Sequence, residues 1–416
     1  MTRLRNLSWS VAAVVGALGI VSLSAQAPAA GQGAPGAAAA QAPGGGRGGG
    51  RAGGGGGRGG AALRTPSALR AVPAETTAAK FKDPNWKAPR TAWGHPDLDG
   101  VWTSDDMRGV PAQRPKDQMD RESLTPEEFA RRAGTDETSR DRAVNQETIL
   151  RNEFGVRTFG YTSVVVEPAN GQMPAITPAA AARRKAQAGI GTFGTVKLED
   201  FDDFTLYDRC ITRGIGAVAP AIYGNAIRIA QTPTELTITY EMIHDTRVIP
   251  LEPVSRNGSA PVLERPRLSP NIKLWMGDAR GRWEGETLVI ETTNFTDRTS
   301  LQGLHSDKLK VTERITRIDA QMLDWRMTVE DPETWVAPFT LRYTITQQPD
   351  YDIYEYGCHE GNTAVSQGLS TERAFQREEE ELRAKGLPIP PRPNRNMEVY
   401  GAPDRSLTVR DVNSAK

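Results

Sequence analysis

The stretch from residue 225 to residue 356 constrains the fold most, because it consists of short β-type segments separated by turn residues. Apolar and polar residues alternate over Lys310–Ile318 and Leu341–Thr346, as they do in strands with one buried face. No helical pattern interrupts the series, which favours consecutive antiparallel strands. We therefore predict a mainly β fold, an antiparallel meander that forms a barrel or a sandwich. The expected strands are Asn225–Gln231, Glu235–Met242, Thr246–Leu251, Leu274–Gly277, Thr287–Thr292, Leu309–Ile318, Met322–Glu330, Thr340–Gln347 and Tyr351–Tyr356.

The middle of this stretch, Leu274–Asp297, is expected to form a strand, a tight turn and a second strand. We place the tight turn at Gly277–Gly281, between Trp275 and Trp283, since glycine adopts positive φ freely and aspartate favours the same geometry. A second turn at Glu284–Glu286 leads into a β-branched run. The segment is thus predicted to be the central hairpin of the meander.

A Gly-x-Trp motif, Gly100-Val101-Trp102, lies in the first convincing strand, Leu98–Thr103. This motif resembles the first strand of lipocalin-like barrels, in which the tryptophan plugs the closed end. The resemblance implies a lipocalin-like barrel, and a sandwich stays open as the alternative.

Helical patterns precede and follow the meander. Thr125 and Thr177 each precede a proline, which is typical of a helix start. We expect these helices to form an insertion at 107–199, after the first strand. A charged segment, Ser370–Lys385, is expected to form a C-terminal helix that begins at Ser370.

The N-terminal residues predict export. Arg3 and Arg5 precede the apolar run Val11–Leu23, as in a Sec-type signal peptide. No cysteine lies near the expected cleavage positions, so we expect no lipobox, a periplasmic or secreted location, and no stable membrane insertion after cleavage. The expected division is a signal peptide (1–29), a disordered Gly/Ala/Arg linker (30–72), an extended N-terminal arm (73–98), a β-barrel-like domain (99–362) with its helical insertion (107–199), and a C-terminal helix with a Pro-rich tail (363–416).

The formal net charge of +0 gives no reason to expect a nucleic-acid partner. In an oxidising compartment the two cysteines, Cys210 and Cys358, are expected to form a disulfide, with two separate buried thiols as the alternative. A disulfide would hold His359 close to the turn at Tyr207–Arg209.

Several longer blocks follow one another in a fixed order: Pro96–Trp102 (PDLDGVW), Tyr207–Gly214 (YDRCITRG), Tyr240–Leu251 (YEMIHDTRVIPL), Pro270–Phe295 (with GRWEGETLVIETTNF) and Tyr354–Asn362 (YEYGCHEGN). They resemble the blocks of a large family of exported proteins from soil bacteria. The resemblance implies common ancestry and brings no particular activity with it.

Acid–base catalysis is one hypothesis, because His244-Asp245 and His359-Glu360 each place an imidazole beside a carboxylate. These four residues are the candidate catalytic set. Adjacent strand residues point to opposite faces, so His244 and Asp245 share a pocket only if a turn intervenes. Hydrogen bonding to loops at the strand ends is the alternative role. The sequence lacks the local spacing of metal sites, so we predict no metal and no cofactor. A metal site that joins His244, His359 and a distant carboxylate stays open as the alternative.

Ligand binding is the other hypothesis. Flat aromatic rings with a polar edge suit sugars and aromatic molecules, and ordinary barrel core is the alternative role for such residues. The candidate contacts are Tyr240, Arg247, Trp275, Arg280, Trp283 and Asn294.

We therefore expect an exported β-barrel that binds a small organic or carbohydrate ligand. The alternatives are an acid–base enzyme (a lyase, isomerase or hydrolase) that uses His244 and His359, and a structural protein of the cell envelope. The enzyme hypothesis requires the two imidazoles to converge on one pocket.

Overall fold

The computed structural model describes residues 85–145, 155, 157–187, 198–221, 223–252, 266–298, 304–347 and 351–390. The expected signal peptide, the linker at 30–72 and most of the Pro-rich tail lie outside the described residues.

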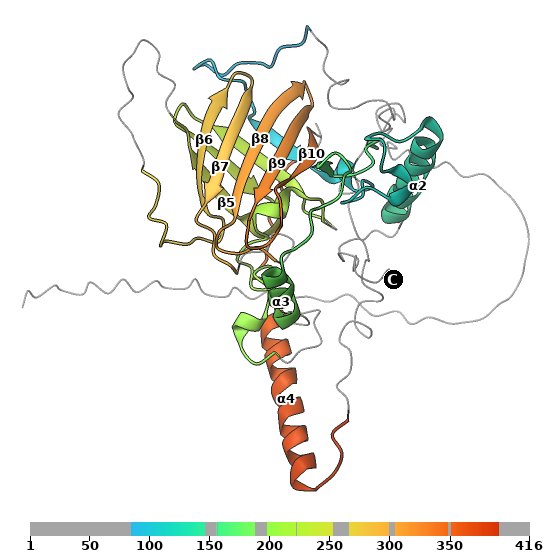
Figure 1. Cartoon of the computed structure of the whole chain (residues 1–416), viewed down its shortest axis with the longest axis vertical. Coiled ribbons are helices and arrows are strands. Elements are labelled where there is room, and N and C mark those ends of the chain that lie inside the picture. The colour runs from blue at the N-terminus through green and yellow to red at the C-terminus, as the bar shows by residue number, and fades with distance from the viewer. Residues whose placement is uncertain are drawn as a thin grey trace, which may run out of the picture. The chain divides into compact units, whose positions relative to one another are not determined.

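Ten strands of the described residues form one sheet, whose curved strands lie side by side in Figure 1. Their order is β5-β4-β3-β1-β10-β9-β8-β7-β6, and β2 pairs with β10 beside this path. Every pairing along the path is antiparallel, which confirms the mainly β meander. The strands are β1 (Gly100–Thr103), β2 (Val165–Glu167), β3 (Ala226–Gln231), β4 (Glu235–Tyr240), β5 (Thr246–Pro250), β6 (Asp278–Glu284), β7 (Thr287–Thr293), β8 (Lys310–Asp319), β9 (Met322–Glu330) and β10 (Phe339–Gln347).

The two ends of the path, β5 and β6, meet and nearly close a barrel. A ring with an odd number of strands cannot be antiparallel at every seam, and the path contains nine strands. The seam between β5 and β6 is accordingly parallel: Leu251 bridges to Gly281, and the Glu252 amide donates to the Gly281 carbonyl at 2.7 Å. A Cβ on Gly281 would lie 2.7 Å from Leu251 Cδ2, so glycine permits the close approach.

The turn predicted at Gly277–Gly281 is wrong, because Asp278–Glu284 is the strand β6. Of the two glycines in this segment, Gly277 has a positive φ, of 69°, and Gly281 lies in the strand, where it contacts Leu251. The second expected turn is present, with Gly285 at φ 62° between β6 and β7.

The strand predicted at Tyr351–Tyr356 is also wrong, since this segment has no ladder of backbone pairs. The neighbouring strand β3 already pairs with β1 and β4 on its two sides, which leaves no edge for another strand.

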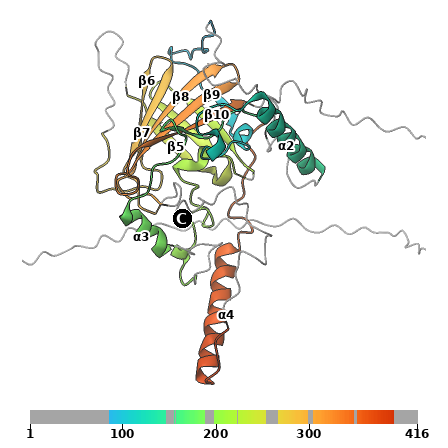
Figure 2. The same cartoon turned by 45° about the vertical axis from the view of Figure 1, so that its right-hand side comes forward.

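The helical insertion and the C-terminal helix are confirmed: the helices are α2 (Pro126–Asn145), α3 (Pro178–Gln187) and α4 (Ala364–Ala384), as Figure 2 shows. Helix α4 begins six residues before the predicted Ser370, after the N-cap Thr363. Among the described residues, no helix combines the length and apolar character needed to cross a membrane.

The alternation of strand directions separates two ends of the barrel. The tight turns β3–β4, β6–β7 and β8–β9 share one end, which we call the short-turn end. Trp102 lies there, fully buried: its indole donates to the Leu98 carbonyl at 2.9 Å, and the Arg317 guanidinium lies 5.3 Å from its ring centre. The β4–β5 turn and the β7–β8 and β9–β10 connections share the other end, which we call the long-loop end.

Candidate functional site

Three segments that are distant in sequence meet at the long-loop end: residues 205–214, the β4–β5 turn, and residues 351–362, which we call the strap. The predicted disulfide between Cys210 and Cys358 is present and joins the first segment to the strap. The Tyr356 amide donates to His244 Nε2 at 3.3 Å, and the Thr212 hydroxyl donates to the Asp245 carboxylate. The site is therefore assembled by long-range contacts.

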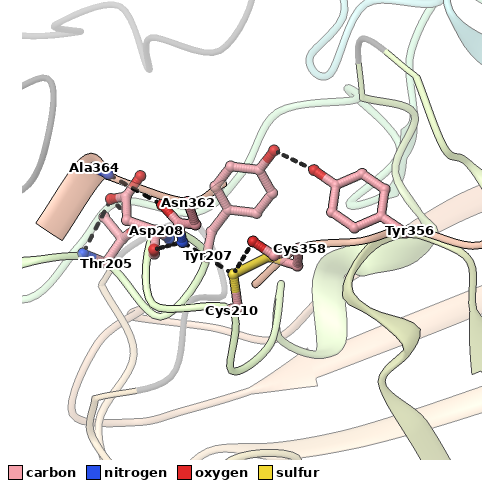
Figure 3. Close-up of a disulfide and its surroundings, with 8 residues drawn as sticks. All are labelled: Thr205, Tyr207, Asp208, Cys210, Tyr356, Cys358, Asn362 and Ala364. Carbon is pink, nitrogen blue, oxygen red and sulfur yellow. Dashed lines mark hydrogen bonds between the residues drawn. A yellow bond between two sulfur atoms is a disulfide. The ribbon is translucent and has the colours of Figure 1, made fainter. Parts of the chain in front are cut away.

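The disulfide brings two tyrosines together, as Figure 3 shows. Tyr207 and Tyr356 point toward one another, and their hydroxyl oxygens are 3.1 Å apart. On the other side of the disulfide, the Asn362 amide donates to the Asp208 carbonyl at 2.9 Å. These contacts fix both tyrosines in place.

A buried carboxylate, Glu241, anchors the first part of the strap. It accepts hydrogen bonds from the Tyr351 hydroxyl at 2.9 Å and from the Tyr354 amide at 3.1 Å. The Ala226 amide at the start of β3 also donates to it, at 3.1 Å. The strap thus lies across the start of β3 and the end of β4.

The backbone is strained at this site. Among the described residues, positive φ values outside glycine occur at Cys210 (55°), Ile243 (74°), His244 (58°) and Asn294 (61°). The first three belong to the site, and a positive φ is least favourable for a β-branched residue such as Ile243. Strain of this kind gathers at functional sites, so it supports the choice of this region.

Three tyrosines present an aromatic surface. The ring of Tyr223 stacks on that of Tyr356 with their centres 6.3 Å apart, and Tyr207 completes the group. Tyr207 and Tyr223 are each 37% exposed. We call Tyr207, Tyr223 and Tyr356 the tyrosine cluster.

Arg213 lies half-buried beside this cluster. Its guanidinium donates to the Ala219 carbonyl at 3.3 Å, and within the described part of the chain no carboxylate pairs with it. Burial lowers the pKa of Arg213, and the hydroxyls of Tyr207, Tyr240 and Tyr356 lie close enough to act against this shift.

Tyr240 connects the cluster with a polar network inside the barrel. Its hydroxyl lies 3.4 Å from Arg247 Nη1, and Arg247 forms a two-point ion pair with the fully buried Glu313 at 3.1 and 2.6 Å. The Trp325 indole donates to the same carboxylate at 3.1 Å. Burial raises the pKa of Tyr240 to about 12, so its hydroxyl keeps its proton near neutral pH. The predicted ligand contacts Tyr240 and Arg247 therefore face inward and bind each other.

The four predicted catalytic residues have separate surroundings. His244 and Asp245 lie in a turn, as a shared pocket requires, but Asp245 binds Thr212 and His244 binds the Tyr356 amide. His359 and Glu360 are exposed in the turn after Cys358. Within the described residues, no hydrogen bond joins either side chain to His244. The strap therefore contacts His244 through the Tyr356 amide, and the catalytic role of the four residues stays a prediction.

Two of the other predicted ligand contacts, Trp275 and Asn294, lie at the long-loop end. The Arg298 guanidinium is 5.8 Å from the Trp275 ring centre, and the Asn294 side chain donates to the Ser269 and Ile272 carbonyls at 2.9 and 3.1 Å. Asn294 thereby holds the loop that precedes β6.

The remaining two, Arg280 and Trp283, lie on β6. Arg280 forms an ion pair with Asp278 and donates to the Pro266 carbonyl at 2.7 Å. Trp283 lies near the short-turn end, where its ring is 5.2 Å from that of His95. The six predicted contacts are thus not one surface. Among the described residues, no three His, Cys, Asp or Glu side chains gather as a metal site would require.

Sequence reasoning missed Arg213 and the tyrosine cluster. A signal was present, because Tyr207 lies three residues before Cys210 and Tyr356 lies two residues before Cys358. The predicted disulfide joins the two segments that carry these tyrosines. Arg213 lies three residues after Cys210, in the same block.

Comparison of the chain with protein-family models, with curated proteins and with solved structures gives no match.

Proposed function

We propose that the protein is an exported binding protein that holds a small organic or carbohydrate ligand against the tyrosine cluster. The observation that carries this proposal is the partial exposure of Tyr207 and Tyr223 beside Tyr356 at the long-loop end of the barrel. Aromatic faces stack on planar molecules and on sugar rings, while phenol hydroxyls supply hydrogen bonds.

The rigidity of the cluster supports binding. The disulfide, the Glu241 anchor and the His244–Tyr356 hydrogen bond all hold the strap that carries Tyr356. A surface fixed before the ligand arrives loses little conformational entropy on binding.

The barrel interior is a less suitable place for the ligand. Its interior contains the fully buried Trp325 and the Arg247–Glu313 pair, and the fully buried Trp102 occupies the short-turn end. Buried side chains occupy this interior, so a ligand at the rim agrees better with the observed packing.

Export and family membership belong to the same proposal. A disulfide suits an oxidising compartment. Three of the blocks that resemble the exported soil-bacterial family, at Tyr207–Gly214, Tyr240–Leu251 and Tyr354–Asn362, supply the candidate site.

The binding proposal is tested by ligand-observed NMR on the purified full-length protein, with a panel of aromatic alcohols, aromatic acids and monosaccharides. We expect at least one class to bind, and Tyr223→Ala to weaken that binding by roughly 3–10-fold, the value of one aromatic contact. Tyr354→Ala is the matched control, since Tyr354 is 54% exposed but packs on Tyr351 outside the cluster. Absence of binding, or equal loss in both variants, would refute the proposal.

The second candidate function is acid–base catalysis, favoured by the strained turn at Ile243 and His244. It requires the His244 and His359 imidazoles to share one site. NMR titration of His244 in the wild type and in His359→Ala tests this requirement. A shift in the His244 midpoint supports a shared site, and an unchanged midpoint rules out the enzyme in this form.

A further inference from the structure

Arg213 differs from the other enclosed arginines in how few partners it has. Arg247 pairs with Glu313, and Arg342 pairs with Asp324 at 2.9 Å. Arg132 lacks such a pair in the hydrogen bonds described, but it donates to two carbonyls, at 2.9 and 2.6 Å. Arg213 donates to one carbonyl, at 3.3 Å. A guanidinium offers five N–H donors, so most of its donors are unused by the described residues.

The surroundings of Arg213 suit an anion. The side chain is half-buried, which strengthens its attraction for a negative charge. The Tyr207 and Tyr356 hydroxyls lie near it, and whichever of the two does not donate to the other can donate to an anion. Burial raises the pKa of Tyr207 and of Tyr356, so both hydroxyls keep their protons at neutral pH.

We infer that Arg213 binds a carboxylate of the ligand while the tyrosine cluster contacts its ring, so that the ligands are small cyclic organic acids. This inference rests on the proposed function and names the ligand class for the same site. The fork of a guanidinium matches the two oxygens of a carboxylate, which favours acids over neutral molecules of the same shape.

The test uses two matched pairs of probes: 4-hydroxybenzoate with 4-hydroxybenzyl alcohol, and galacturonate with galactose. Isothermal titration calorimetry on the full-length protein should show at least one acid binding about 30-fold more tightly than its neutral partner, the value of a charge-assisted hydrogen bond pair. Arg213→Met should abolish the preference, and Arg213→Lys should retain part of it, since lysine keeps the charge and loses the fork.

Arg209→Met is the matched control. Arg209 lies in the same segment, but its guanidinium pairs with Asp202 at 2.8 Å and lies over the Phe201 ring. The preference for the acid should persist in this variant. Circular dichroism and the melting temperature show whether each variant folds. If Arg213→Met does not fold, the comparison of Arg213→Lys with the wild type still tests the inference.

Three results would overturn the inference in distinguishable ways. If the neutral probe binds as tightly as its acid and Tyr223→Ala weakens both, the ligand class is wrong and the proposed function stands. If neither member of either pair binds, both proposals fail. Equal loss of acid binding in Arg209→Met and Arg213→Met would also overturn the assignment of Arg213.

Discussion

The Tyr351 hydroxyl lies 2.9 Å from each carboxylate oxygen of Glu241. Both side chains are buried, and Glu241 also accepts from the amides of Ala226 and Tyr354. One carboxylate in the β4–β5 turn therefore ties the strap to the barrel. The position of Tyr356, and with it the tyrosine cluster, depends on this anchor.

Tyr351→Phe should lower the free energy of unfolding by about 1.5–3 kcal/mol, because the buried carboxylate loses a hydroxyl donor. Urea denaturation measures the change. Tyr354→Phe is the control: its hydroxyl has no hydrogen bond among the described residues, so the change should stay within about 0.5 kcal/mol. Equal losses in the two variants would contradict the anchoring role of Glu241.

Replacing both cysteines, Cys210→Ser with Cys358→Ser, should lower the free energy of unfolding by about 3–5 kcal/mol. The bond closes a loop with a sequence separation of 148, and such a crosslink restricts the unfolded chain. Denaturation with and without a reductant measures the effect. The wild type should lose stability on reduction and the double variant should not. If the oxidised wild type and the variant unfold at the same denaturant concentration, the crosslink contributes nothing.

The strand pattern was predictable because period-two alternation is a local property. Apolar and polar residues alternate over Lys310–Ile318 and Leu341–Thr346, and the strands β8 and β9 match the predicted bounds within a residue. The error at Gly277–Gly281 has a long-range cause. The glycines of this segment favour a turn locally. In the fold, however, Gly281 lies on β6 and permits the close approach of Leu251, at the end of β5. No local pattern contains that contact.

The candidate site was less predictable than the fold, for the same reason. The pairing of Cys210 with Cys358 was the one long-range contact that the sequence indicated. The role of Arg213 depends on which residues the folded chain places around it, and a carboxylate partner for an arginine cannot be recognised from spacing. Tyr240 and Arg247 were predicted to contact a ligand. In the folded chain, Arg247 instead forms an ion pair with Glu313, which lies across the barrel.

Asp105 should make stability depend on pH. Burial raises its pKa from 3.8 to about 7. The folded state therefore binds more protons than the unfolded state between these values. The stabilising contribution is fully present below about pH 4 and is lost as the pH rises to about 7. Within this window the free energy of unfolding should fall by up to about 1.4 kcal/mol per pH unit.

Asp105→Asn isolates this effect, because the amide retains an oxygen for the Asn225 side chain, which donates to Asp105 Oδ1 at 2.8 Å. Urea denaturation at pH 4.5 and pH 7.5 should show a smaller loss of stability with rising pH in the variant. A slope equal to that of the wild type would show that Asp105 does not titrate in this range.

Removing one member of the Arg247–Glu313 pair should lower the free energy of unfolding more than replacing both members with apolar residues would suggest. Glu313→Leu leaves a buried guanidinium without its counter-charge and should lower the free energy of unfolding by about 3–5 kcal/mol. Arg247→Met should cost a similar amount for the opposite reason. The double variant Arg247→Met with Glu313→Leu removes both charges, so its loss should be smaller than the sum of the two single losses by at least about 2 kcal/mol. Chemical denaturation of all four proteins gives this coupling energy. Additive losses would show that the two charges do not stabilise each other inside the barrel.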